Sequence, residues 1–292
     1  MIGKVKRYLE LQTAWHRRLL VERREGKQRR LVGLPLFPPP EEVLAAPYVF
    51  VLSTGRSGTA FLTAFLANSQ KLSVHHAPKP ELEYVSSLIH RNVPEPEALD
   101  LALLAARFDL FVDSYRSGTT YVETNNRITF FAPAAARLLP NARFIHLVRH
   151  PAEFVRSGVR RGYYADGVVQ HQRLQPACHA EWESYSAVEK IGWEWNEING
   201  FIESFKMSVP GDRVLTMRSE ALFRGPSALT SVMEFIGVGG DADLLARMAK
   251  GALKPVNQQI SGTFPTYEYW SDADRSGLAR VATLAVAYGY DL

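Results

Sequence analysis

The sequence predicts an α/β fold with three layers, in which a central parallel sheet is flanked by helices. Two short apolar runs, at residues 48–53 and 143–148, have the β-branched and aromatic composition of strands buried on both faces. A segment with helical periodicity follows each run, at 59–68 and 152–161. Strands that alternate with helices pair in parallel through right-handed crossovers, which is the basis of this fold prediction.

The remaining elements continue the same alternation. We predict further strands at 72–75, 110–113 and 213–217, and an extended segment at 121–124. Helices are predicted at 132–139 and 226–236, because the first stops at Pro140 and the second at Gly237.

The first forty residues differ from the rest of the chain in charge. Residues 1–31 hold ten Lys/Arg against three Asp/Glu, whereas the remainder holds 24 basic and 27 acidic residues. We therefore predict a basic N-terminal helix and a proline-rich connector within 1–40, followed by one α/β domain at 47–292. The helix is expected to pack on protein, with a membrane-surface or nucleic-acid contact as the alternative.

Composition excludes several classes of protein. An apolar fraction of 46% with 22% charged residues is that of a globular chain of 292 residues, not a disordered one. No apolar stretch is long enough for a membrane span or a signal peptide, so we expect a soluble, cytoplasmic protein. Cys178 is the single cysteine, so no intramolecular disulfide or thiolate metal site is expected. His146 and His150 are interpreted as packing or capping residues rather than metal ligands.

Residues 53–61 (STGRSGTAF) place a glycine-bearing turn between a buried strand and a helix. In such a turn, consecutive backbone N–H groups and the positive end of the helix surround an anion. Gly55 and Gly58 allow a close approach of the backbone, and Arg56 adds a fixed cation. The loop therefore predicts a phosphate site, with an ordinary strand-to-helix turn as the alternative.

Two other motifs do not match this loop. A nucleoside-triphosphate P-loop requires G-x-x-x-x-G-K-[ST], a string that occurs nowhere in the chain. A serine-hydrolase elbow requires G-x-S-x-G, but Thr59 stands two residues after Ser57. The letters RSGT recur at 116–119 before an extended segment rather than a helix, and we assign this repeat to a substrate-side loop.

A second candidate anion site lies at residues 144–158 (FIHLVRHPAEFVRSG). Its strand ends at Arg149, and the helix that begins at Pro151 carries Ser157. A guanidinium at the carboxyl end of a strand, beside a hydroxyl on the next helix, suits a second phosphate close to the first loop. Taken alone, the segment favours the alternative of a salt-bridged arginine and a surface serine.

The ordered pair of segments resembles the sulfotransferases that use 3′-phosphoadenosine 5′-phosphosulfate (PAPS), notably bacterial and Golgi-type members with a GRSGT loop. Residues 139–142 (LPNA), 193–196 (WEWN) and 214–237 resemble further parts of that family, so the likeness runs from about residue 48 to the end. The resemblance implies a P-loop-like fold, a PAPS donor, the product 3′-phosphoadenosine 5′-phosphate (PAP) and no metal ion.

The resemblance also implies the donor-site residues. The first loop would hold the 5′-phosphosulfate, and Arg149 and Ser157 would hold the 3′-phosphate that distinguishes PAPS from ATP. The first-loop residues are Arg56, Ser57, Gly58, Thr59 and Ala60. The sequence departs from the cytosolic members near its end, where Lys250 and Lys254 stand in place of their Arg-Lys-Gly loop.

Sulfuryl transfer to a hydroxyl requires a general base near the sulfur, while Arg56 would act only through its charge. Among the residues that follow the strand at 72–75, we rank His76 first and His75 second as the base, followed by Glu81 or Glu83. A structural role is the alternative for each histidine. Glu123 is a further candidate, and residues 162–164 (GYY) are expected in a solvent-facing loop, with acceptor binding as the alternative.

The sequence thus predicts a PAPS-dependent sulfotransferase that acts on a hydroxyl, or an amine, of a carbohydrate or small-molecule acceptor. A P-loop-like kinase and a non-enzymatic nucleotide-binding adaptor remain alternatives. We expect no nucleic-acid partner and leave a homo-oligomer open.

Overall fold

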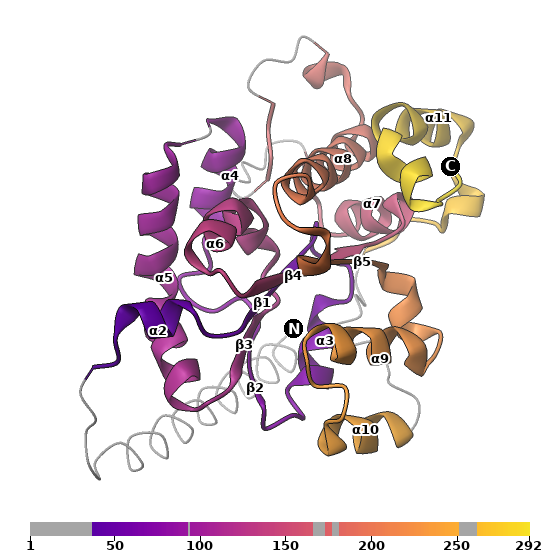
Figure 1. The fold of residues 1–292 in the computed structure, drawn as a ribbon. Helices are drawn as coiled ribbons and strands as arrows, with labels where there is room; N and C mark the ends of the chain where they lie inside the picture. Colours follow the sequence, from indigo (N-terminus) through magenta and orange to yellow (C-terminus); the bar gives the residue numbers. More distant parts are fainter. Residues whose placement is uncertain (1–36, 93, 166–172, 177–180, 251–261) are drawn as a thin grey trace, which may run out of the picture. The chain divides into compact units, whose positions relative to one another are not determined.

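Five parallel strands form the central sheet, in the spatial order β2-β3-β1-β4-β5 (Figure 1). Every neighbouring pair is parallel, and Tyr48 of the central strand pairs with Tyr121 on one side and Ala142 on the other. The predicted parallel sheet is confirmed. The strands are β1 (Tyr48–Leu52), β2 (Leu72–His75), β3 (Thr120–Glu123), β4 (Ala142–Val148) and β5 (Val214–Arg218).

The computed structural model describes residues 37–292 except 93, 166–172, 177–180 and 251–261. Residues 41–292 form one compact unit. The predicted basic helix and the first half of the proline-rich connector (33–36) lie outside the described residues. Within the described part, no helix is both long and apolar enough to cross a bilayer.

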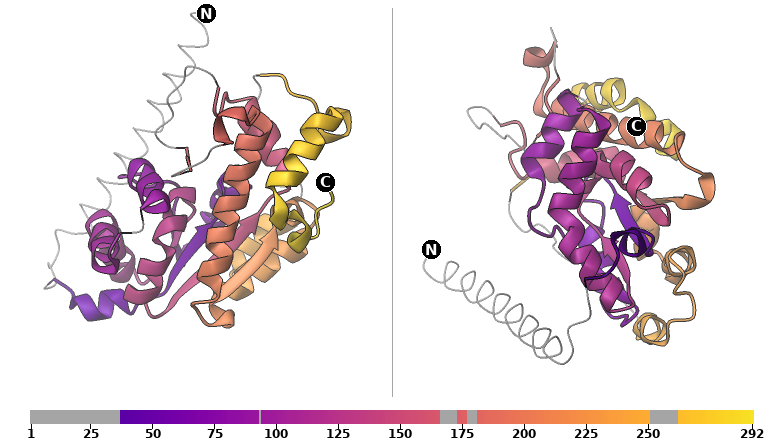
Figure 2. Two further views of the ribbon diagram at one scale, coloured as in Figure 1. Left: turned by 90° about the horizontal axis from the view of Figure 1, so that it is seen from above. Right: turned by 60° about the vertical axis from the view of Figure 1, so that its left-hand side comes forward.

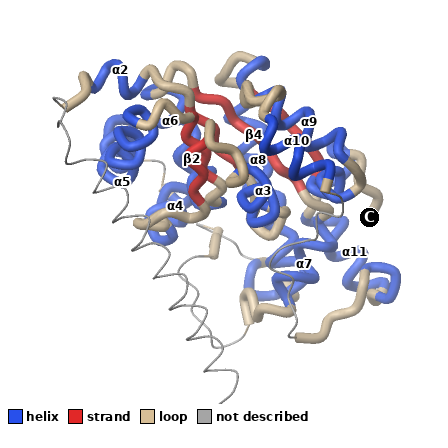
Figure 3. The backbone as a smooth tube through the Cα atoms, turned by 90° about the horizontal axis from the view of Figure 1, so that it is seen from below, coloured by secondary structure: helices blue, strands red, loops and turns tan. Residues whose placement is uncertain are grey.

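Helices cover both faces of the sheet, which gives the predicted three layers (Figures 1 and 3). One face packs on α5 (Pro96–Arg116), α6 (Ala132–Leu138) and α8 (Ala187–Lys206), and the other on α3 (Thr59–Leu66) and α9 (Pro226–Phe235). Strand β1 explains this arrangement: Phe50 and Leu52 face the first group, whereas Val49 and Val51 face the second. Each of these buried side chains contributes about 1.5–3 kcal/mol of hydrophobic stabilisation.

Helices α7 (Pro151–Val159), α8 and α11 (Asp272–Val281) lie side by side (Figure 2). A third apolar cluster joins them. Gly192 of α8 allows this close approach, because a Cβ there would lie 2.7 Å from Leu278 and 2.9 Å from Val281. The other helices are α2 (Pro40–Leu44), α4 (Glu83–Arg91) and α10 (Ala242–Ala249). Short 3-10 helices are η1 (Asn126–Phe131), η2 (Trp182–Ser184), η3 (Gly211–Arg213), η4 (Ser219–Phe223), η5 (Tyr267–Tyr269) and η6 (Thr283–Tyr288).

The strand predicted at 110–113 is wrong, because this segment is the last part of the long helix α5. Its apolar letters belong to a helical pattern in which Leu99, Leu103, Arg107 and Phe111 follow one another at four-residue intervals and are all buried. The third strand is instead β3, where the sequence predicts only an extended segment.

A fully buried ion pair fastens α5 to the sheet. The Arg107 guanidinium donates two hydrogen bonds to the Glu123 carboxylate, at 2.8 and 2.9 Å, and neither side chain is exposed. Tyr121 donates to the same carboxylate at 2.7 Å. Arg107 also donates to the Pro80 carbonyl at 2.9 Å, so the pair additionally holds the loop that follows β2.

We expect Glu123→Gln to lower the free energy of unfolding by about 3–5 kcal/mol, because the buried Arg107 charge loses its partner. Replacing Arg107 with Met, Glu123 with Leu and Tyr121 with Phe together should recover most of that loss, since no buried charge or hydroxyl is then left unpaired. Urea denaturation monitored by circular dichroism measures both effects.

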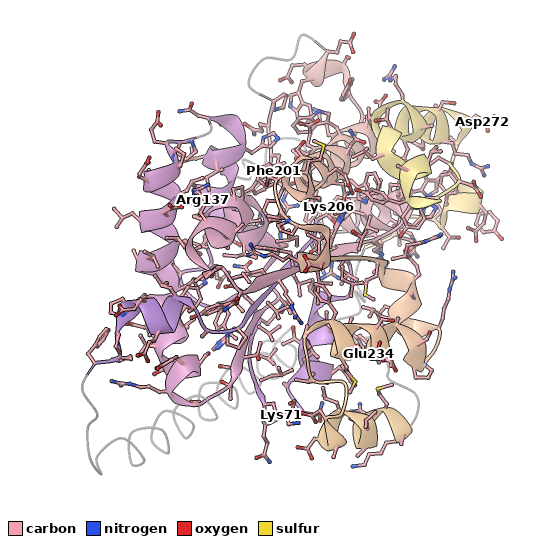
Figure 4. All side chains as sticks on the ribbon, viewed as in Figure 1. Lys71, Arg137, Phe201, Lys206, Glu234 and Asp272 are labelled. Carbon is pink, nitrogen blue, oxygen red and sulfur yellow. The ribbon has the colours of Figure 1, made fainter. Side chains whose placement is uncertain are left out.

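The exposed pair between Arg137 (Figure 4) and Asp100 is the matched control, with side chains that are 40% and 24% exposed. Arg137→Gln should change the free energy of unfolding by less than about 1 kcal/mol. A loss in Glu123→Gln as small as in Arg137→Gln would contradict the structural role assigned to the buried pair.

Candidate active site

A cleft of about 870 Å³ opens at the carboxyl ends of all five strands. Its lining includes Gly55 after β1, His76 after β2, Asn125 after β3, Arg149 after β4 and Ser219 after β5. Ligands of open parallel sheets bind at this edge, where the loops that follow the strands converge.

The loop between β1 and α3 is built from left-handed backbone. Gly55, Arg56 and Gly58 have φ values of 78°, 56° and 83°, and Gly58 is the N-cap of α3. A Cβ at Gly58 would meet only ordinary contacts, so the backbone angle rather than space favours glycine there. At the start of the loop, the Ser53 N–H donates to the Thr129 hydroxyl at 3.1 Å.

The structure brings the two candidate anion segments into direct contact. The Arg149 guanidinium donates to the Arg56 carbonyl at 2.6 Å, and Arg56 Nε donates to the Ser157 hydroxyl at 3.1 Å. Glu153, in the first turn of α7, accepts from Arg149 at 3.0 Å. Trp195 of α8 donates its indole N–H to the Arg149 carbonyl at 2.9 Å, which fixes the end of β4.

Most of the loop residues named from the sequence face the cleft. Gly58, Thr59 and Ala60 line it together with Arg56, Arg149 and Ser157. Ser57 does not line it: its side chain is fully buried, and its hydroxyl lies 3.4 Å from the Gly55 carbonyl.

Arginines dominate the β1 and β4 side of the cleft, although residues beyond 31 carry a net negative charge. Arg156 and Arg160 line it as well, each held through Nε by a carbonyl of the segment at 262–264. Burial and the neighbouring Arg161 lower the pKa of Arg56 from its usual value. A guanidinium remains charged at neutral pH even so, and this side of the cleft is therefore suited to anions.

The two histidines at the end of β2, His75 in the strand and His76 after it, have different surroundings. His75 does not line the cleft: its Nε2 lies 2.9 Å from the Ser73 hydroxyl, and its ring stacks on Tyr121 at 4.8 Å. Burial, followed by the charge of Arg107, lowers its pKa to about 4. His76 lines the cleft, and burial lowers its pKa although Thr124 and Glu81 oppose the shift.

A chain of hydroxyl groups defines the tautomer of His76. Thr63 donates to the Thr59 carbonyl at 2.7 Å, so Thr124 donates its own proton either to Thr63, 2.6 Å away, or to the His75 carbonyl, 3.3 Å away. The Thr124 oxygen then accepts from His76 Nδ1 at 2.9 Å. This assignment, made from hydrogen bonding, places the proton on Nδ1 and the lone pair on Nε2.

The carboxylates considered as the general base also differ in location. Glu81 and Glu83 line the cleft, and the Glu81 carbonyl accepts from the Asn125 amide at 3.1 Å. Glu123 is committed to the buried pair with Arg107, so its proposed role as a base is wrong.

Two loop assignments change. The repeat at 116–119 precedes β3 at the opposite, amino edge of the sheet, so it is not a substrate-side loop. The segment at 162–164 is not solvent-facing: Tyr163 lines the cleft, and the Tyr164 hydroxyl donates to the Leu174 carbonyl at 2.6 Å. Lys250 ends α10 beside Arg247 in a separate hollow, and Lys254 lies outside the described residues.

The histidines near β4 have structural roles, as predicted. His146 is buried with its Nε2 2.9 Å from Asn199, and His150 caps α7 by accepting from the Ala152 N–H at 3.2 Å. Among the described residues, no group of three or more His, Cys, Asp or Glu side chains could hold a metal ion.

Left-handed backbone surrounds the cleft. The described non-glycine residues with positive φ are Arg56, Ala77, Leu82 and Tyr164. Arg56 and Ala77 line the cleft, whereas Leu82 and Tyr164 each adjoin a lining residue. Each of these conformations costs about 1–2 kcal/mol in an L-residue. Such strain concentrates at functional sites in proteins.

Sequence reasoning missed several lining residues, among them Arg127, Arg173, Glu220 and Phe223. Arg127 follows β3 at the same sheet edge as the predicted loops, and this topological position is a signal that could have found it. Arg173 belongs to no regular element, and only the folded chain brings it to the cleft.

Comparison with known protein families matches residues 47–241 to the sulfotransferase family. No curated protein matches the chain. The sulfotransferase domain from the curacin biosynthetic pathway has 17% identity and a TM-score of 0.52, over 85% of this chain and 99% of that one. The sulfotransferase domain from the Synechococcus PCC 7002 olefin synthase has 20% identity and a TM-score of 0.50, over 85% and 96%. A sulfotransferase from Mycobacterium avium has 15% identity and a TM-score of 0.51, over 86% and 80%.

At these identities the similar structures establish the fold. The family match covers about two thirds of the chain, and it includes all five strands and the loop after each of them. The chain therefore belongs to the sulfotransferase family.

Proposed function

We propose that the protein moves a sulfuryl group from PAPS to a hydroxyl, or an amine, of a carbohydrate or small-molecule acceptor. The contact between the two anion segments carries this proposal. Arg149 donates to the Arg56 carbonyl, and Arg56 donates to Ser157, all within one cleft. A nucleotide with separate 3′- and 5′-phosphates requires two such sites at close range.

The residues of the cleft suit the groups of this donor. PAPS, when bound, supplies the sulfuryl group on a phosphate that can leave. Arg56 and the backbone N–H groups at the start of α3 would stabilise the charge that develops on the leaving phosphate. Arg149 and Ser157 would bind the second phosphate, and Phe223, which lines the cleft near Gly58, offers an aromatic face to a nucleobase.

His76 is the residue best placed to accept the proton of the acceptor. It lines the cleft, and its hydrogen bond to Thr124 leaves the Nε2 lone pair available as a base. Because its pKa lies below the usual value of about 6.5, the imidazole is neutral at pH 7.

The donor assignment is tested by thermal stabilisation of the full chain with PAP, AMP, ADP and ATP. PAP should raise the melting temperature most, because it alone places one phosphate on each segment. Arg149→Ala should remove this preference. Equal stabilisation by AMP and PAP, or a preference for ATP with magnesium, would contradict the PAPS assignment and favour an adaptor or a kinase.

Arg56→Ala should slow single-turnover sulfuryl transfer by about 10²–10³-fold, while PAP affinity falls less, because its charge acts mainly on the leaving group. Alanine also adopts the left-handed φ of 56° poorly. Arg56→Gly is therefore the companion variant, since it removes the guanidinium without that strain. If Arg56→Ala transfers slowly and Arg56→Gly transfers at the normal rate, the loss comes from the backbone and not from the missing guanidinium.

Replacing His76 with Gln should lower kcat by about 10²–10⁴-fold and leave PAP affinity unchanged. In the unaltered enzyme, kcat/KM should fall as the pH drops through the lowered pKa of His76, because protonation removes the base. This acid limb therefore lies below about pH 6.5, and it should be absent from His76→Gln. His75→Gln, altered just outside the cleft, is the control, and a larger loss of kcat in this control would reverse the assignment.

A further inference from the structure

Arg127 and Arg173 lie in the same cleft but outside both predicted anion segments. Arg127 stands in η1, directly after β3. Its backbone N–H donates to the Asn125 side chain at 3.0 Å, and its carbonyl accepts from Ser86 of α4 at 2.8 Å. These two bonds fix the residue at the carboxyl edge of the sheet, on the same side as His76.

Arg173 is a buried cation with an unused donor. Its side chain is 7% exposed, and one terminal nitrogen donates to Glu194 at 3.1 Å. Its guanidinium lies over the Tyr163 ring, 3.9 Å from the ring centre. Its Nε is buried and has no hydrogen-bond partner among the described residues. A buried donor without a partner costs about 1–3 kcal/mol, so it calls for a ligand acceptor.

The charges around the two arginines do not balance. Burial and the charge of Arg173 lower the pKa of Arg127, while Glu194 and Glu83 only partly oppose this shift. Glu194 is buried and already accepts from both the side chain of Arg173 and the backbone of Leu174. Glu83 and Glu194 thus both lie near the two guanidinium groups, but six arginines and four glutamates of the described residues line the cleft as a whole, and this excess of positive charge favours an added anion.

Tyr163 connects this pair to the donor side. Its ring lies beneath Arg173, and its hydroxyl is close enough to influence the pKa of Arg56. A ligand group held by the pair would therefore lie within reach of the loop after β1, in the same cleft as His76.

We propose that Arg127 and Arg173 form a subsite for an oxyanion (a carboxylate, sulfate or phosphate) carried by the acceptor. This inference rests on the proposed function and specifies its substrate class: the acceptor is already acidic before transfer. The planar donor forks of the two guanidinium groups match such an oxyanion, and the free Nε of Arg173 supplies one of the hydrogen bonds.

The test titrates acetate, sulfate and phosphate separately into the full chain saturated with PAP, with sodium chloride holding the ionic strength constant. At least one anion should raise the melting temperature further, and the anion with the strongest effect identifies the acidic group of the acceptor. Arg127→Gln should weaken its binding by about tenfold or more while PAP binding is retained. Arg137→Gln, altered on the outer surface of α6, is the control with an equal change in charge.

Arg173→Gln leaves Glu194 buried without its partner, so the paired change Arg173→Gln with Glu194→Gln is the second variant. Loss of the anion response in both Arg127→Gln and this pair would support the subsite. If Arg56→Gly abolishes the anion response and Arg127→Gln leaves it unchanged, the anion binds in the donor loop and the proposal is wrong. Displacement of PAP by the anion, or no response to any of the three anions, would also overturn the proposal. Failure of PAP to bind would instead contradict the proposed function, and anion titration of the nucleotide-free chain would still test the subsite.

Discussion

The hydrogen bond from the Arg149 guanidinium to the Arg56 carbonyl joins the two halves of the cleft. It exists because β1 and β4 are adjacent and in parallel register, with Leu52 opposite His146, so that the loop after β1 lies beside the last residues of β4. Neighbouring strands lie about 4.8 Å apart, which brings the loops that follow them within reach of a single side chain. The site therefore depends on strand order, and strand order depends on the alternating burial of β1 between two helical layers.

The same edge of the sheet concentrates charge that composition does not reveal. Residues beyond 31 carry more acidic than basic side chains, yet arginines from the loops after β1, β3 and β4 line one cleft. The arginines of this protein include one in a buried ion pair, Arg107, and a group that lines the cleft. Arg107 is matched by Glu123 deep between α5 and the sheet, whereas the six arginines that line the cleft in the described part of the chain share its lining with four glutamates.

The elements nearest the site were the most predictable from sequence. Strands β1 and β4 are apolar, β-branched and followed by helix signals, so local pattern and tertiary burial agree. The segment at 110–113 has similar letters but lies in the 21-residue helix α5, because the four-residue spacing of buried side chains from Leu99 to Phe111 outweighs local propensity. The sequence ranks His76 above His75 but does not show which of them enters the cleft, because the hydroxyl contacts that hold His76 come from α3 and the end of β3. Arg173 has no local motif at all.

At the left-handed residues around the cleft, selection for stability and selection for this site oppose each other. Arg56, Ala77, Leu82 and Tyr164 adopt conformations that glycine adopts without strain, so substitution by glycine would relieve strain where the cleft is shaped. Selection for heat resistance alone would therefore favour glycine at these positions, and the side chains that shape the cleft would be lost. Where a relative keeps non-glycine residues at these positions, selection for the function of the cleft has kept them there.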